Sequence, residues 1–191
     1  MLHLEREKLV RFEFNLVRFE NFYIFEIIEN FKEAIDSGHK ISTVSSFDKR
    51  TNKTYTRYLI QICSKDFVKN LINFGVTNRK SYICNFPNLK KKYYPDFLRG
   101  LFDGDGSTSR KSKNNIRIKF IATKEIILEI HRFFKDNYDI EPHPIYSVSD
   151  NMNVYNTHYF KDAQKVLSIL YKNSNEKNRL TRKFLIYENK S

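Results

Sequence analysis

The sequence has no tryptophan and few of the residues that mark several common protein classes. Only five of its 191 residues are glycine and four are proline, which excludes collagen-like and linker-like chains. No apolar run is long enough to cross a bilayer, so we expect no membrane-spanning helix and no membrane partner. The N-terminus has no signal-peptide hydrophobic stretch, which predicts an intracellular protein of the cytoplasm or an organelle, not a secreted one.

Cysteine is scarce as well, because Cys63 and Cys84 are the only two in the chain. Two cysteines make no disulfide framework. Neither is at metal-ligand spacing from the other or from the five scattered histidines. We therefore expect both thiols to be reduced and buried.

Aromatic side chains and positive charge are both abundant. The 17 phenylalanines and 12 tyrosines provide apolar mass for a core. The 34 Lys and Arg against 22 Asp and Glu give a net charge of +12, with a pI near 9.6. Such an excess favours a polyanion, and because the basic residues are not confined to one amphipathic helix, it favours nucleic acid over a membrane surface. A solubilising surface would have the same composition.

The hydrophobic periodicity predicts an α+β fold in which one order of elements occurs twice. In the second half we place a strand at 115–121, a helix after the N-cap Thr123, a hairpin at 144–149 with 154–159, and a closing helix at 160–171. In the first half we place a strand at 11–16, a helix at 22–35, a hairpin at 39–47 with 55–63, and a closing helix at 64–74 that ends at Gly75. We assign 1–89 to a first repeat and 90–191 to a second, and a chance recurrence of such units is the alternative.

One segment between the halves has no counterpart in the first. Pro95 can begin a helix, which we place at 95–106, and Gly100 and Gly104 lie on one of its faces. Asp103 and Asp105 follow at its C-terminal end, where the helix dipole disfavours carboxylates. Carboxylates flanked by glycine suit a hard divalent cation, although the Asp-Gly-Asp-Gly sequence alone is also typical of a turn.

This segment resembles the LAGLIDADG motif of homing endonucleases and intron maturases. The stretch 98–106 reads LRGLFDGDG and keeps the first leucine, the first glycine, the second leucine, both aspartates and the final glycine. The resemblance extends over the whole chain, to members with two repeats. It implies an α+β fold with a pseudo-symmetric duplication, in which each repeat is a curved antiparallel sheet backed by helices.

The resemblance also implies an activity and the residues that perform it. The expected function is a sequence-specific endonuclease for double-stranded DNA, of the kind carried by mobile introns and inteins, that uses Mg²⁺ or Mn²⁺. Asp105 would bind the metal with the carbonyl of Gly104, and Asp103 would help to hold the helix ends. Gly100, Gly104 and Leu101 would pack the motif helix between repeats. By position, the other catalytic residues would be Lys177, Lys80 and Lys124.

We expect the DNA contacts on the polar faces of the predicted strands. Arg117 and Lys119, like Arg57 and Gln61, alternate with apolar residues and so point away from the helices. Arginine and glutamine can bond base edges, whereas lysine more often holds phosphate. The segment 107–115, taken as a loop, would follow the DNA backbone with Arg110, Lys111 and Lys113.

The first repeat departs from the family pattern, because no motif precedes its strand. The opening Met1-Leu2-His3-Leu4 is no such motif, so we expect the first motif helix to be missing. One catalytic acid would then remain. A second polypeptide or a second copy of this chain would supply the other helix, or the chain would nick one strand. The alternative is a noncatalytic nucleic-acid-binding protein, such as an RNA intron maturase or a domesticated DNA-binding regulator.

Overall fold

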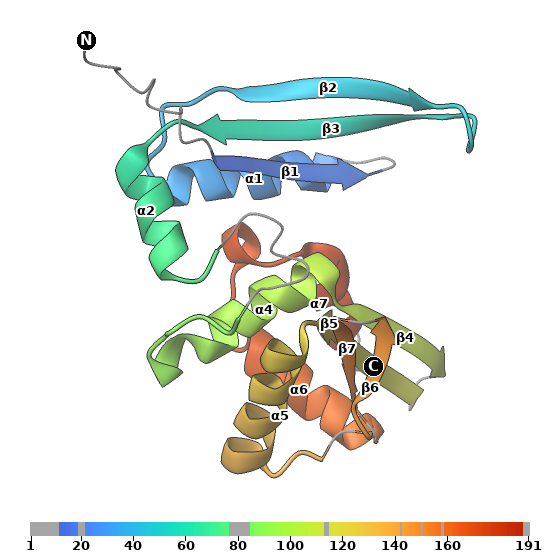
Figure 1. Ribbon diagram of the computed structural model, residues 1–191. Coiled ribbons are helices and arrows are strands. Elements are labelled where there is room, and N and C mark those ends of the chain that lie inside the picture. The colour runs from blue at the N-terminus through green and yellow to red at the C-terminus, as the bar shows by residue number, and fades with distance from the viewer. Residues whose placement is uncertain are drawn as a thin grey trace. The chain divides into compact units, whose positions relative to one another are not determined.

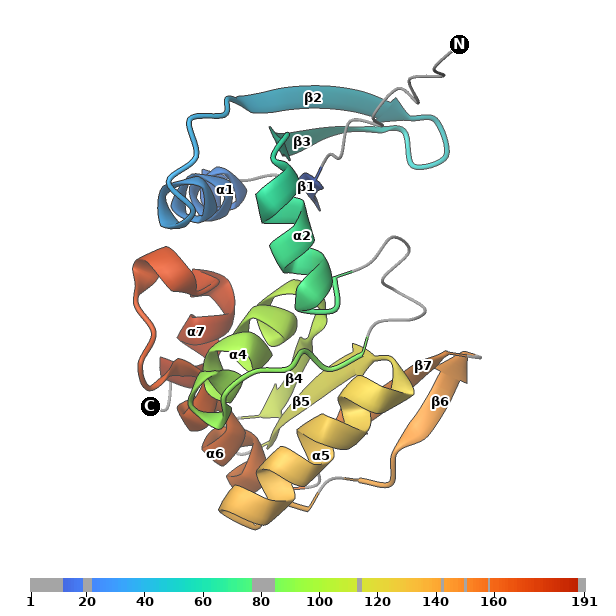
Figure 2. The same ribbon diagram turned by 60° about the vertical axis from the view of Figure 1, so that its left-hand side comes forward.

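The computed structural model describes residues 12–18, 22–76, 85–112, 115–141, 143–149, 151–157 and 159–188. The chain forms two compact units, Met1–Leu71 and Ile72–Ser191. Each unit contains one antiparallel sheet packed against helices (Figures 1 and 2). The predicted α+β class is confirmed, and the boundary between repeats at residues 89 and 90 stays a prediction.

The first unit is a three-stranded sheet with the strand order β1-β3-β2. Its strands are β1 (Phe12–Arg18), β2 (Ile41–Asp48) and β3 (Lys53–Ile62), and its helices are α1 (Phe22–Ala34) and α2 (Lys65–Asn73). Helix α1 lies along β1 and β3 in Figure 1, and buries Ile28 with Ile60 and Ile62. After α2, Gly75 has a φ of +86° and its N–H bonds the carbonyl of Ile72, a turn that glycine favours.

The second unit is a four-stranded sheet with the strand order β4-β5-β7-β6. Its strands are β4 (Ser107–Ser112), β5 (Asn115–Ala122), β6 (Tyr146–Ser149) and β7 (Met152–Asn156). Its helices are η1 (Lys91–Tyr93), α4 (Tyr94–Asp105), α5 (Lys124–Tyr138), α6 (Phe160–Tyr171), η2 (Glu176–Asn178) and α7 (Thr181–Glu188).

The core of the second unit lies between this sheet and the helices α4, α5 and α6. Along β5, alternate residues from Ile116 to Ala122 are buried, while Arg117 is exposed on the opposite face. The ring of Phe120 packs at 5.2 Å from that of Phe102 in α4 and at 6.0 Å from that of Tyr155 in β7. Within the described part of this unit the helices pack against one face of the sheet, and we call the opposite face, on which Arg117 is exposed, the open face.

The two sheets have the same order of strands, which confirms the duplication. Strands β1, β2 and β3 and helices α1 and α2 follow the chain order of β5, β6, β7, α5 and α6, and the order β1-β3-β2 matches β5-β7-β6. Within the described residues, nothing in the first unit corresponds to α4 or β4. The segment 1–11, which contains no LAGLIDADG-like motif, lies outside the described residues.

The structure corrects two expectations. The segment that we took as a loop forms strand β4, and Ser107 pairs with Lys119 while Ser109 pairs with Arg117. The sequence does not indicate this strand, because an edge strand with one open face has few apolar residues and so shows no clear alternation of apolar and polar positions. Cys63 is free, as predicted, but exposed and not buried, and Cys84 lies outside the described residues. None of the helices in the described residues is long and apolar enough to cross a membrane.

Candidate active site

The candidate active site is the C-terminal end of α4, where the chain leaves the helix at Gly106. This residue is extended, with φ −71° and ψ 160°, and its N–H donates to the carbonyl of Phe102 at 2.9 Å. A Cβ at Gly106 would lie 2.3 Å from Cδ2 of Phe102 and 2.6 Å from its carbonyl oxygen. Only glycine fits this close approach, so the final glycine of the motif is needed to end the helix beside Phe102.

A lysine from the other end of the unit caps α4. Lys183 of α7 is 3% exposed, and its Nζ donates to the carbonyl oxygens of Phe102, of Asp103 at 3.1 Å and of Gly106 at 2.5 Å. The last carbonyls of a helix have no partner within the helix, and they form the negative end of its dipole. The ammonium therefore satisfies these groups and offsets the unfavourable potential that carboxylates experience there.

Asp103 is tied down at the same helix end. Its Oδ1 accepts a hydrogen bond from the hydroxyl of Tyr171 at 2.5 Å, and its Oδ2 accepts one from the backbone N–H of Leu180 at 2.8 Å. Burial raises the pKa of Asp103, partly opposed by these two bonds and by the positive charges of Lys183 and Arg99. Burial also raises the pKa of Tyr171, and the neighbouring carboxylate adds to the effect. Asp103 thus joins α4 to α6 and to the start of α7.

Arg99 makes the third connection from α4 to the C-terminal part of the unit. It is 5% exposed, and its Nε donates to the carbonyl of Asn178 at 3.0 Å. Its Nη1 donates to the carbonyl of Leu170 at 3.2 Å and to Oδ1 of Asp96 at 2.8 Å. Together with Asp103 and Lys183, it holds α4 against α6, η2 and α7.

The opposite side of α4 is open. Gly100, Gly104 and Asp105 are exposed, and a Cβ at either glycine would meet nothing within 4 Å. Leu101, which we grouped with the two glycines, is half-buried and packs against the core of the second unit. The open strip therefore carries two glycines, and the exposed carboxylate of Asp105 at the end of the helix is accessible to a ligand.

The donor groups at this end are compatible with a hard divalent cation. The described residues include no group of three or more His, Cys, Asp or Glu side chains able to hold a metal. Mg²⁺, however, is commonly held by one or two carboxylates, with substrate phosphates and waters completing its shell. The carboxylate of Asp105 and the carbonyl of Gly104 have the oxygen chemistry for such a partial site.

The open face of the four-stranded sheet carries polar and basic side chains in register. Lys119 of β5 lies between Ser107 of β4 and Asn156 of β7, and Arg117 pairs with Ser109. Asn156 also donates from Nδ2 to the hydroxyl of Tyr146 in β6 at 3.4 Å. Donors and acceptors thus run across the sheet, which suits contacts with base edges and phosphates. The predicted pair Arg117 and Lys119 lies here, whereas the sequence did not single out the asparagine, tyrosine or serines.

The two predicted catalytic lysines within the described residues are both exposed, and their catalytic roles stay predictions. Lys177 is exposed on η2, where its N–H bonds Oδ1 of Asn175, and Lys124 is exposed at the start of α5. The lysine that reaches the end of α4 is Lys183, which we did not predict. The apolar residues around it, Leu180 and Phe184, were a signal, because a lysine inside a helical apolar stripe is placed toward a core.

Several predicted residues lie partly or wholly outside the described residues. Lys80 and Lys113 are outside them. Arg57 is in β3, and Arg110 and Lys111 are in β4, but the side chains of these three are not described. Gln61 is half-buried in β3, opposite Glu13 of β1. The roles proposed for these residues stay predictions.

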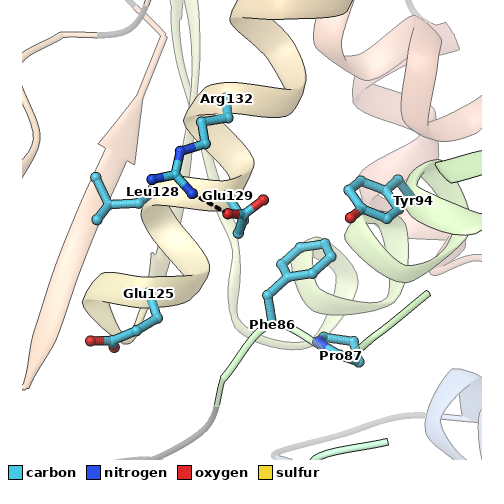
Figure 3. A pocket seen from close by; sticks show the side chains of 7 residues that line it. All are labelled: Phe86, Pro87, Tyr94, Glu125, Leu128, Glu129 and Arg132. Carbon is cyan, nitrogen blue, oxygen red and sulfur yellow. Dashed lines mark hydrogen bonds and ion pairs between the residues drawn. The ribbon is translucent and has the colours of Figure 1, made fainter. Parts of the chain in front are cut away.

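A surface hollow of about 400 Å³ lies elsewhere, beside the outer face of α5. Figure 3 shows Phe86 and Tyr94 on one side, and Glu125 and Glu129 of α5 on the other. Arg132 forms an ion pair with Glu129. None of the predicted site residues lines this hollow, so it is separate from the end of α4.

The sequence profile of the LAGLIDADG-like domain family matches residues 93–188. This range contains α4, Asp105, Lys183 and the whole four-stranded sheet. No curated protein matches the chain.

Two solved structures have a similar fold. The homing endonuclease I-WcaI, bound to its DNA recognition sequence, is similar with a TM-score of 0.60 and 14% identity, over 95% of this chain and 77% of that one. The N-terminal LAGLIDADG domain of DUF199/WhiA is similar with a TM-score of 0.54 and 16% identity, over 90% of this chain and 75% of that one. At these identities the similarity concerns the fold alone.

Proposed function

The chain belongs to the LAGLIDADG-like domain family, and from this premise we propose that it is a sequence-specific endonuclease that hydrolyses phosphodiester bonds in double-stranded DNA. Support comes first from Asp105, whose exposed carboxylate ends a helix that Arg99, Asp103 and Lys183 hold in place. A catalytic carboxylate must be both accessible and well oriented. Asp105 meets both conditions, whereas Asp103 is committed to structural bonds.

In this proposal Asp105 and the carbonyl of Gly104 hold Mg²⁺ or Mn²⁺. A metal bound there would polarise the scissile phosphate and lower the pKa of a bound water. The chain's own part is to place the carboxylate and to keep the helix end fixed. Lys183 serves as a positioning residue, because its ammonium is occupied by three carbonyls. Lys177, Lys124 and Lys80 remain the proposed groups for transition-state charge.

DNA would lie against the open face of the four-stranded sheet. Arg117 can bond a guanine bidentately, while Lys119, Asn156 and the serines of β4 can contact phosphates or base edges. The net charge of +12 supports such binding. The base preference would depend on how these side chains meet the major groove.

A second motif helix would be needed to cut both strands. The open strip of α4 supports a partner helix, because Gly100 and Gly104 allow another backbone to approach closely. We propose that a second copy of this chain, or another polypeptide, supplies that helix. A chain acting alone would nick one strand.

The decisive experiment compares wild type with Asp105→Asn on a DNA library, with Mg²⁺ and with EDTA, scoring nicks and double-strand breaks. Wild type should cut only with the metal, and Asp105→Asn should bind equally but cut at least about 100-fold more slowly. The control is Asp136→Asn, which removes the same charge from an exposed position on α5 and should cut like wild type. If wild type and Asp105→Asn bind equally and neither cuts, the endonuclease proposal fails.

A noncatalytic nucleic-acid-binding protein is the second candidate. It is favoured by the single accessible acid at the end of α4 and by the lack of a larger cluster of metal ligands in the described residues. Binding to duplex DNA without cleavage would support a DNA-binding regulator. Preferential binding to a structured RNA intron would support an intron maturase.

A further inference from the structure

A second hollow, of about 440 Å³, is formed by the helix layer of the second unit. Its walls come from η1, the first turns of α4, the end of α5, and α6 with the two residues that follow it. These helices cover the buried face of the sheet, so the hollow opens away from the open sheet face. A ligand bound here would leave the sheet free.

The hollow is strongly basic. Lys92, Lys165 and Lys172 line it, and all three are exposed. Asp96 is the only acid in the lining, and its carboxylate is already paired with Arg99 at 2.8 Å. The neighbouring Lys90 and Lys91 are also exposed and add to the positive potential. This charge suits an anionic group such as a phosphate.

The rest of the lining suits a nucleotide. Tyr138, Pro95 and Ile169 provide an aromatic and apolar wall. Lys165 donates to the main-chain carbonyl of Tyr138, which places an ammonium beside this wall. Basic groups that follow a backbone, next to an aromatic ring on which a base can stack, are typical of sites for single strands. A concave site of this volume admits one nucleotide but not a rigid duplex.

We propose that this helix-side hollow binds one nucleotide of a single-stranded nucleic acid, with the phosphate at Lys92, Lys165 and Lys172 and the base against Tyr138. The site would be additional to the sheet surface proposed for duplex DNA. It does not depend on Asp105 or on cleavage. The protein would then bind a single strand and a duplex on different faces of the same unit.

The test measures the affinity of the full chain for a short single-stranded oligonucleotide, as RNA and as DNA, and for a duplex of equal length. The double variant Lys165→Gln/Lys172→Gln should weaken single-strand binding by about tenfold and leave duplex binding within about twofold. The control Lys40→Gln/Lys69→Gln removes two exposed charges outside the hollow and should leave single-strand binding nearly unchanged. The variant Lys92→Glu, which alters another exposed wall residue, should also weaken it.

A reciprocal variant separates this site from the proposed function. Arg117→Ala/Lys119→Ala should weaken duplex binding and spare single-strand binding, and Asp105→Asn should spare both. If Lys165→Gln/Lys172→Gln and the control Lys40→Gln/Lys69→Gln lose the same single-strand affinity, binding reflects general charge attraction and the proposal is overturned. Inorganic phosphate serves as a separate probe. If the hollow binds phosphate but every variant binds the single strand as tightly as wild type does, the proposal is also overturned.

Discussion

Two aspartates of α4, two positions apart, have different tasks. Asp103 accepts bonds from Tyr171 and Leu180, while Asp105 is exposed. The helical period places them on different sides of α4, so that Asp103 faces α6 and the start of α7 while Asp105 is exposed. The motif thus divides anchoring and ligand binding between two identical side chains.

The buried Asp103 predicts a pH dependence of stability. Its pKa is raised above the ordinary value of 3.8 because of burial, so the folded chain binds this proton more tightly than the unfolded chain does. The unfolding free energy should therefore fall as the pH rises from 3.8 through the folded pKa. Urea unfolding at several pH values should show this fall in wild type and in the control Asp136→Asn, but not in Asp103→Asn. The contribution of Asp103 is the difference in unfolding free energy between wild type and Asp103→Asn. If this difference increases with pH over the same range, the raised pKa of Asp103 is contradicted.

Removal of the charge of Lys183 should lower the stability of the folded chain. Lys183→Met keeps most of the apolar stem but leaves the carbonyls of Phe102, Asp103 and Gly106 without this donor. We expect the unfolding free energy to fall by about 2 to 3 kcal/mol, measured by urea denaturation. The exposed Lys177→Met should change it by less than about 0.5 kcal/mol. Similar effects of the two substitutions would argue against the cap.

The three glycines of the motif differ in the space around them. Gly100 and Gly104 are open, whereas Gly106 is pressed against Phe102. Gly100→Ala should raise the unfolding free energy by about 0.5 to 1 kcal/mol, because alanine favours the helix. Gly106→Ala should lower it by about 1 to 3 kcal/mol, because Phe102 or the helix end must move. Thermal unfolding of both variants checks the opposite signs, and two changes of the same sign would refute the contrast.

Sequence periodicity predicted some elements better than others. The last repeat helix was expected at 160–171 and is observed as α6, Phe160–Tyr171, because its apolar stripe is regular. The sequence does not predict strand β4, because all six of its residues are serine, threonine or basic and show no alternation of apolar and polar positions. Helix α7 was not predicted either, since its buried face includes Lys183.

For the molecule as a whole, the charge of +12 predicts salt-dependent binding to DNA. The logarithm of the association constant should fall linearly with the logarithm of the salt concentration. Arg117→Ala/Lys119→Ala should reduce the magnitude of that slope by about 2 if both side chains contact phosphate, and by less if Arg117 contacts a base. Titrations at four or more salt concentrations measure this, and affinity that hardly changes with salt would contradict an electrostatic interface.

Local sequence was sufficient for the α+β class, the order of most elements, the duplication and the position of Asp105 in its motif. Periodicity and motifs are properties of neighbouring residues, so they can be recognised without knowledge of long-range contacts. The roles of Lys183, Asp103 and Arg99 depend on partners that lie 68 to 81 residues away in the chain. The meeting of α4 with α6 and α7 creates those contacts, and the pairing of β4, β5 and β7 assembles the open polar face. Only tertiary packing decided these features, because the hydrogen bonds that define them join segments far apart in the chain, and the sequence of one segment does not identify the other.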